Sequence, residues 1–316
     1  MTNPINVIMG HTNKGTGSWT VFWRSLLQSF GEIKKNNPLR LAGATAFFTT
    51  FALPPILIIL FQLFSLILNR RLVGTELMKT ITDIFGKDSA AQIRQTTRGF
   101  RTLAINWYIT LAGFLFLIFV ATTLFSVIKN SLNDIWNIGV KNRPGIRFNL
   151  LLRPRSMGII LVAGLLFLAG IFMDGFEILA SGYFQKIWPE GWLFFRSALN
   201  EIVSVIIITI WFIVLFRYLA DGRPDWKIAI VGGCLTGILF SIGKTLLSFV
   251  MRNANFHTLY GASGSIVLIL LFVFYSSFIL YFGASFIKVY AKAIGRPLRL
   301  VNHAFKYQIQ EMKKEM

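Results

Sequence analysis

The chain has 316 residues, of which 54% are apolar and 15% aromatic, and its net charge is +19. Only 14% of the residues are charged, well below the roughly 25% of soluble domains, so the composition argues against an ordinary soluble enzyme. The single cysteine, Cys234, excludes a disulfide framework and a cluster of thiolate metal ligands.

Six apolar stretches have the length of a membrane span. Crossing a hydrocarbon core of ~30 Å takes about 20 helical residues. In lipid every backbone polar group must be satisfied within its own segment, which selects helices over open strands. We therefore predict an all-α, polytopic integral membrane protein with six transmembrane helices and additional amphipathic surface helices. The spans are expected at about 41–68, 105–128, 157–180, 199–220, 228–250 and 265–290.

The chain begins with a polar stretch, residues 1–17, which we interpret as a flexible N-terminal arm. Apolar residues then recur at helical spacing from Trp19 to Ile33, which predicts an amphipathic helix on the cytoplasmic membrane surface. A helix that binds a protein partner is the alternative. Residues 18–295 are expected to form one six-helix membrane domain, and residues 296–316 a basic cytoplasmic tail.

The first span contains the pair Pro54-Pro55. Two adjacent prolines remove two backbone donors, which predicts a break or kink near mid-membrane. Broken helices recur at transporter binding sites, whereas a kink that serves only packing is the commoner explanation. The following outer loop, residues 69–104, has two amphipathic patterns and is expected to form a helical hairpin on or in the outer face.

Most of the 32 Lys and Arg residues lie at the two termini and in the loops expected on the same side of the membrane. This bias places both termini in the cytoplasm. Positive-inside topology and contact with anionic headgroups explain the charge better than nucleic-acid binding does. We therefore expect membrane lipids as partners and no nucleic acid.

Four charged residues are expected at membrane depth, where such groups mark pathways or ion pairs. Asp174 and Glu177 lie near the outer end of the third span, Glu201 near the outer start of the fourth, and Lys244 within the fifth. At the helical rise per residue, Asp174 and Lys244 both lie roughly 25 Å from the cytoplasmic boundary. We predict an ion-paired cluster around a polar cavity in the outer half of the bilayer. Snorkelling to the outer headgroups is the alternative.

Small and polar residues recur along one face of the fifth span, and they are predicted to point its lysine toward the bundle interior: Gly233, Gly237, Ser241, Lys244 and Ser248. Motifs of catalytic or metal-binding spacing are missing from the sequence. The three histidines lie far apart, and neither HExxH nor a phosphate-binding glycine loop occurs. We expect no enzymatic activity, no metal and no cofactor.

Three blocks of sequence form a recognisable set: Leu41 to Pro55, Arg223-Pro224 through Gly232-Gly233, and Tyr260 to Ser265 with the following span that ends Gly283-Ala284-Ser285. Together they resemble the YihY/BrkB family of bacterial inner-membrane proteins, over roughly residues 20–295. The resemblance implies six transmembrane helices with cytoplasmic termini in the inner membrane. Family members often carry Glu after the final Gly-Ala, where this chain has Ser285, so any ion-coupling role of that carboxylate is absent or relocated here.

The resemblance does not supply one activity, because the family has been labelled ribonuclease BN-like and also described as transporters or virulence-associated proteins. We expect an inner-membrane transporter or translocator, with a lipid or amphiphile as the favoured substrate. Asp174, Glu177 and Lys244 would line its path and Glu201 its mouth. The alternative is a non-transporting scaffold or envelope-assembly partner. A membrane-bound ribonuclease fits poorly, because these acidic residues lie away from cytoplasmic RNA. A homo-oligomer is compatible with the size.

Overall fold

The computed structural model describes residues 18–65, 107–140, 189–253, 264–301 and 303–308, together with scattered residues within 74–95 and 162–170. The described part is mostly helical. Its long helices are α1 (Ser18–Lys34), α2 (Pro38–Ser65), α4 (Trp107–Trp136), α7 (Pro189–Tyr218), α8 (Trp226–Asn253) and α10 (Gly264–Ala293). Its short strands are β1 (Ile138–Val140), β2 (Gly222–Arg223), β3 (Arg299–Leu300) and β4 (Ala304–Lys306).

Among the described helices, three contain segments long and apolar enough to cross a membrane: Ala198–Tyr218, Trp226–Leu247 and Ile266–Ala293. They coincide with the predicted fourth, fifth and sixth spans. The helices α2 and α4 cover most of the predicted first and second spans. The predicted third span, 157–180, lies almost wholly outside the described residues.

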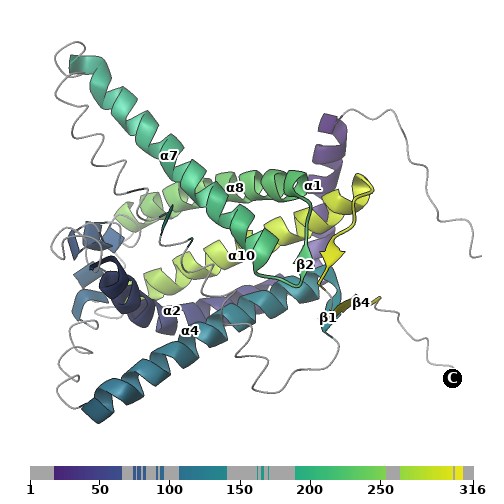
Figure 1. Cartoon of the computed structure of the whole chain (residues 1–316). Coiled ribbons are helices and arrows are strands. Elements are labelled where there is room, and N and C mark those ends of the chain that lie inside the picture. Colours follow the sequence, from purple (N-terminus) through teal and green to yellow (C-terminus); the bar gives the residue numbers. More distant parts are fainter. Residues whose placement is uncertain are drawn as a thin grey trace, which may run out of the picture.

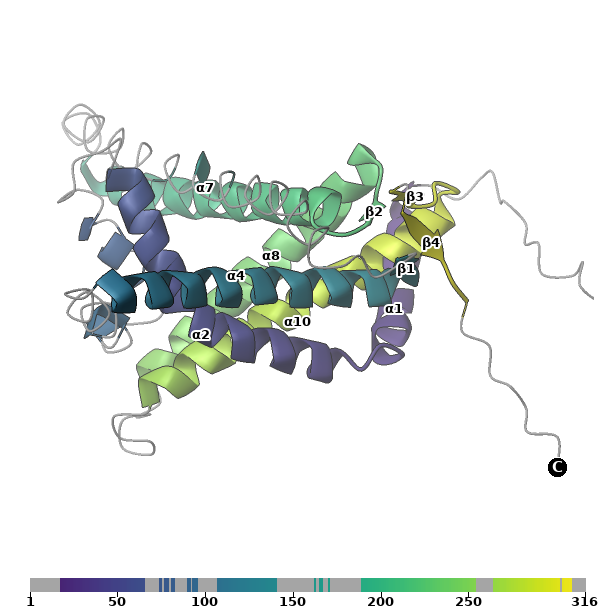
Figure 2. The same ribbon diagram turned by 60° about the horizontal axis from the view of Figure 1, so that its bottom comes forward.

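Helix α10 is the centre of the bundle. It packs against α1, α2, α4 and α8, and α7 packs against α8. Both views show α1 crossing one end of the bundle, beside the strands (Figures 1 and 2). We call this the strand end. The far end is the opposite one, where α7 and α10 begin and α8 finishes.

The C-terminal segment folds back onto the strand end. Gly295 (φ +67°) ends α10, and the backbone N–H of Arg296 donates to the carbonyl of Ala291 at 2.9 Å, the bond of a Schellman cap. The returning chain pairs antiparallel twice, as β3 with β2 and as β4 with β1. Part of the predicted basic tail therefore closes the connections that follow α4 and α7.

Glycines allow α8 to lie very close to both of its neighbours. A Cβ atom added at Gly237 would lie 2.4 Å from Oγ1 of Thr209 on α7, and one added at Gly243 would lie 1.9 Å from the ring of Tyr275 on α10. Small residues permit such approach between membrane helices. Gly233 also meets α7, at Ile213. The glycines of the predicted small and polar face of α8 therefore face α7.

Helix α2 is continuous through Pro54-Pro55, so the proline pair does not interrupt the helical backbone. Figure 2 shows the later part of α2 turning away from the line of its first part. Adjacent prolines are an established cause of such a bend, since they remove backbone donors and crowd the preceding turn. The helix is kinked rather than broken.

The described residues of the predicted outer loop are helical and pack into the bundle. Leu77, Ile81, Ala90 and Ile93 are buried, and they form one apolar cluster with residues of α2 and α10, namely Ala46, Ile269, Phe272 and Val273. Burying these side chains removes apolar surface from water or headgroups, which favours insertion. This segment therefore contributes to the core and does not only cover the surface.

Candidate functional site

The first candidate site lies where α7 packs against α8. The Nζ atom of Lys244 is 3.6 Å from Oε2 of Glu201. Ser241 donates a hydrogen bond from its hydroxyl to Oε1 of Glu201 at 2.8 Å, and Lys244 donates to the hydroxyl of Ser204 at 3.3 Å. We call these four residues the seam cluster.

Helical spacing in the sequence explains how the residues of the seam cluster come together. Glu201 and Ser204 are three residues apart on α7, as are Ser241 and Lys244 on α8, so each pair shares one helix face. Counted from the ends of their helices at the strand end, Glu201 and Lys244 both lie roughly 26 Å along the bundle. That is near the far edge of a hydrocarbon core of ~30 Å.

The seam cluster is only partly enclosed. The side chain of Glu201 is 53% exposed and that of Lys244 is 23% exposed. An exposed ion pair contributes little to stability, whereas charges at membrane depth are costly and usually serve a function. The arrangement presents an anion, a cation and two hydroxyl groups at one point on the side of the bundle.

The structure brings together two of the four charged residues predicted to form one cluster, Glu201 and Lys244. Asp174 and Glu177 lie outside the described residues, so their membership stays a prediction, as does the cavity. Pro54 and Pro55 lie on α2, which packs mainly against α10 and α4. The kink is therefore on a different part of the bundle from the α7–α8 contact.

A second polar cluster lies at the strand end, around Asp221 in the connection between α7 and α8. Its side chain is fully buried. Lys129 Nζ is 3.0 Å from Oδ2, Asn133 donates to Oδ2 at 2.8 Å, and His303 Nε2 is 3.4 Å from Oδ1. The Asp221 backbone N–H also donates to Oδ1 of Asn133 at 3.0 Å. We call these four residues the Asp221 network.

Electrostatics keep Asp221 ionised. Burial raises the pKa of its carboxyl group, but the Lys129 ammonium and the hydrogen bond from Asn133 outweigh burial, so the pKa lies below its ordinary value. The network joins α4, the α7–α8 connection and the C-terminal segment. The sequence interpretation missed it because α4 continues to Trp136, past the predicted end of the second span. The four-residue spacing of Lys129 and Asn133 was an available signal.

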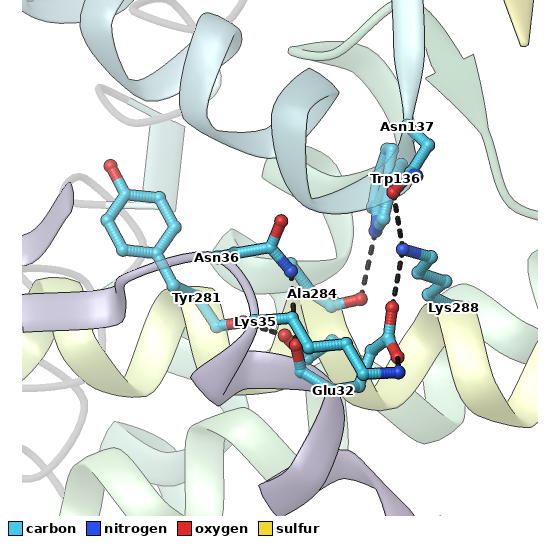
Figure 3. Close-up of polar contacts among 9 residues, drawn as sticks. Glu32, Lys35, Asn36, Trp136, Asn137, Tyr281, Ala284 and Lys288 are labelled. Carbon is cyan, nitrogen blue, oxygen red and sulfur yellow. Dashed lines mark hydrogen bonds and ion pairs between the residues drawn. The ribbon is translucent and has the colours of Figure 1, made fainter. Parts of the chain in front are cut away.

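A third polar cluster fixes α1 to the bundle (Figure 3). Lys288 of α10 lies between Glu32 of α1 and Asn137, with Nζ at 2.6 Å from the carboxylate of Glu32 and 2.6 Å from the amide oxygen of Asn137. Trp136 donates its indole N–H to the carbonyl of Ala284 at 2.9 Å. Burial raises the pKa of Glu32, but Lys288 and Lys35 together lower it below its ordinary value. This cluster holds the surface helix against α10 and the end of α4.

Helix α1 has one side buried against the bundle and a second, largely exposed stripe. Ser25, Ser29 and Ile33 are buried, and the ring of Phe22 lies 5.3 Å from that of Phe286 on α10. A second stripe is largely exposed and consists of Trp19, Trp23, Leu27 and Phe30, of which Phe30 also lies 4.8 Å from the ring of Phe282 on α10. The apolar residues of this predicted amphipathic helix are thus divided between the contact with α10 and an exposed stripe beside it.

Metal ligation finds no support within the described part of the chain, where no group of three or more His, Cys, Asp or Glu side chains could hold a metal ion. The clusters above consist instead of paired charges with hydroxyl and amide groups. Such sets can bind or orient a polar group through hydrogen bonds and charge.

Comparison with known proteins gives the same class of membrane protein. The family model described as Virulence factor BrkB matches residues 29–304. A UPF0761 membrane protein of Teredinibacter turnerae is 27% identical over 265 residues, which cover 83% of this chain and 59% of the relative. One from Pseudomonas paraeruginosa is 25% identical over 244 residues, 77% of this chain and 57% of the relative. The chain thus spans less than two thirds of the length of these relatives. No solved structure matches.

Proposed function

This chain belongs to the Virulence factor BrkB family of membrane proteins, and from that premise we propose that it is a translocator that carries a lipid or another amphiphile across the membrane. In this proposal the polar part of the substrate passes the seam cluster, and the protein catalyses no chemical reaction. The observation that carries the proposal is the partly exposed Glu201–Lys244 pair, whose two residues lie within candidate membrane spans.

The chemistry of the seam cluster suits a headgroup. The Lys244 ammonium can bind a phosphate or carboxylate, while the Glu201 carboxylate and the hydroxyl groups of Ser204 and Ser241 can accept or donate hydrogen bonds. At 3.6 Å the ion pair is longer than a tight charge-assisted hydrogen bond. An arriving polar group could therefore replace part of the pairing without leaving either charge alone.

Exposed apolar residues on either side of the seam cluster favour an amphiphile over a small ion. They are Ile202, Ile206 and Ile210 on α7 and Ile238, Ile242 and Leu246 on α8. A substrate whose headgroup contacts the seam could leave its acyl chains along these faces, in contact with lipid. A small ion has no apolar part that these side chains could contact. This neighbourhood is the second support for a lipid-like substrate.

We further propose that the chain crosses the bacterial inner membrane six times with both termini in the cytoplasm. The supporting observation is the placement of basic residues at the strand end, which the positive-inside rule assigns to the cytoplasm. The elements that meet there carry Lys34, Lys35, Arg40, Lys129, Arg217, Arg223, Lys227, Lys288, Lys292, Arg296, Arg299 and Lys306.

A flux assay tests the function. Purified protein would be placed in liposomes that contain a trace of fluorescent phospholipid, and the rate at which label becomes accessible to an external quencher would be measured. We expect wild-type protein to accelerate exchange between leaflets and Lys244→Gln or Glu201→Gln to slow it by about tenfold, as for loss of one charged interaction. Lys292→Gln, at an exposed lysine in the last turn of α10 outside the seam cluster, should leave the rate unchanged.

The outcomes separate the candidates. Equal exchange rates for wild type and both seam variants would show that the lipid headgroup does not pass the seam cluster. Protein that is folded but gives no exchange of any phospholipid tested would argue against lipid translocation. Recovery of one stable partner with the inactive protein would then favour the scaffold alternative.

A further inference from the structure

Two arginines face each other across a strand pair at the strand end. In the antiparallel pairing of β2 with β3, Arg223 is the direct partner of Arg299. Directly opposite residues on such a pair have neighbouring Cβ atoms on one face, and like charges placed there repel each other. The two strands are only two residues long, so this repulsion is a substantial disadvantage to the pairing.

Nearby charges relieve the repulsion only in part. Asp225 is 3.3 Å from Nε of Arg299 and 3.7 Å from a guanidinium nitrogen of Arg296. Arg223 and Lys227 are exposed, and neither has an acidic partner within ion-pair distance among the residues that the structure describes. We call Arg223, Lys227, Arg296 and Arg299 the basic rim. One carboxylate against four cations leaves the rim strongly positive.

The basic rim begins where the lipid-facing surface of α8 ends. Trp226 is 52% exposed and Tyr218 is 38% exposed, and their rings meet edge to face at 6.2 Å. Arg217 lies over the Trp226 ring at 5.2 Å. Exposed Trp and Tyr residues at the ends of spans mark the headgroup level. The side chains that follow along α8 on the same side are apolar and exposed, including Ile230 and Ile238.

We propose that the basic rim is a binding site for the headgroup of an anionic phospholipid in the leaflet at the strand end. The lipid phosphate would lie between the opposed guanidinium groups of Arg223 and Arg299, which can each donate two parallel hydrogen bonds. The acyl chains would run along the exposed apolar stripe of α8, past Trp226. An anion between the two arginines would turn their repulsion into a shared attraction and so stabilise the β2–β3 pair.

Native mass spectrometry tests this site on the full-length protein with defined lipids. The protein would be released from detergent with dioleoylphosphatidylglycerol or dioleoylphosphatidylcholine added at equal concentration, and retained lipid would be counted. We expect wild type to retain the anionic lipid. The double variant Arg223→Gln/Arg299→Gln should bind it about tenfold more weakly, whereas Arg223→Lys/Arg299→Lys should retain most of the binding.

A matched control separates a site from general charge. Arg24→Gln/Lys34→Gln removes two exposed cations of α1 at the same end of the molecule and should keep wild-type retention. Equal loss in this control, or full retention by the double glutamine variant, would overturn the proposal. So would displacement of the lipid by millimolar inorganic phosphate, because that would make the rim a site for a free anion. The assay measures binding without flux, so its result is independent of the translocation proposal.

Discussion

The seam cluster and the Asp221 network each combine a lysine and a carboxylate with further hydrogen-bonding groups, yet they differ in enclosure. The Asp221 carboxylate is fully buried and lies 3.0 Å from Lys129, whereas Glu201 is 53% exposed and lies 3.6 Å from Lys244. Asp221 has contacts with Lys129, Asn133 and His303. A carboxylate that is enclosed and fully paired can hold elements together, while one left open can still bind something else.

The location of each cluster supports this distinction. The Asp221 network joins segments that are far apart in the sequence, since Lys129 belongs to α4 and His303 to the C-terminal segment. The seam cluster joins only α7 and α8, which are consecutive and already packed through glycines. The Asp221 network should therefore contribute more to the stability of the fold than the seam cluster does.

The largest expected effect is the loss of Asp221. Asp221→Ala would leave Lys129 and Asn133 without their buried partner, and breaking a buried pair in this way usually costs about 3–5 kcal/mol. Thermal unfolding of purified protein in detergent would measure the loss of stability. Asp225→Ala is the matched control, because this residue lies in the same connection but pairs with exposed arginines. A loss as large in the control would show that enclosure does not decide the effect.

A smaller effect is expected from crowding α8 against α10 beside the seam cluster. A methyl group at Gly243 would meet the Tyr275 ring at 1.9 Å, and overpacking of this kind costs about 1–3 kcal/mol. The same unfolding measurement should find Gly243→Ala destabilised. Gly31→Ala on α1, where an added Cβ meets nothing within 4 Å, should be neutral or slightly stabilising. Similar melting of both variants would mean that the α8–α10 contact can relax.

Low pH should reduce the stability of the strand end. The pKa values of Asp221 and Glu32 are both lowered in the folded protein, from ordinary values of 3.8 and 4.5. A depressed pKa contributes stability above the unfolded value, and the contribution is lost as pH falls through the folded value. Melting temperature should therefore decline below about pH 4.5, and Glu32→Gln should flatten the upper part of that decline. An unchanged profile in the variant would assign the acid sensitivity to other carboxylates.

Part of this arrangement could be predicted from sequence because it depends on one helix at a time. Length and hydropathy located α7, α8 and α10. The small and polar face of α8 predicted that Lys244 points toward the bundle interior, and in the structure Lys244 pairs with the half-exposed Glu201 of α7. The Asp221 network could not be found in this way. Its members come from three separate segments, and His303 reaches Asp221 only because the chain turns back at Gly295 and pairs with β1 and β2. Pairing across long sequence separation leaves no local periodic signal.

The smallest effect on stability is expected at the seam cluster. A double-mutant cycle with Glu201→Gln and Lys244→Gln isolates the interaction between the two side chains, provided that neither single variant creates a new contact. For an exposed pair we expect a coupling free energy of about 0–1 kcal/mol. The corresponding cycle with Asp221→Asn and Lys129→Gln should give a clearly larger value. A coupling above about 2 kcal/mol at the seam would make Glu201 and Lys244 a structural pair like Asp221 and Lys129. A small coupling together with slowed lipid exchange would mean that two costly charges at membrane depth are retained for the substrate, since they do little for the fold.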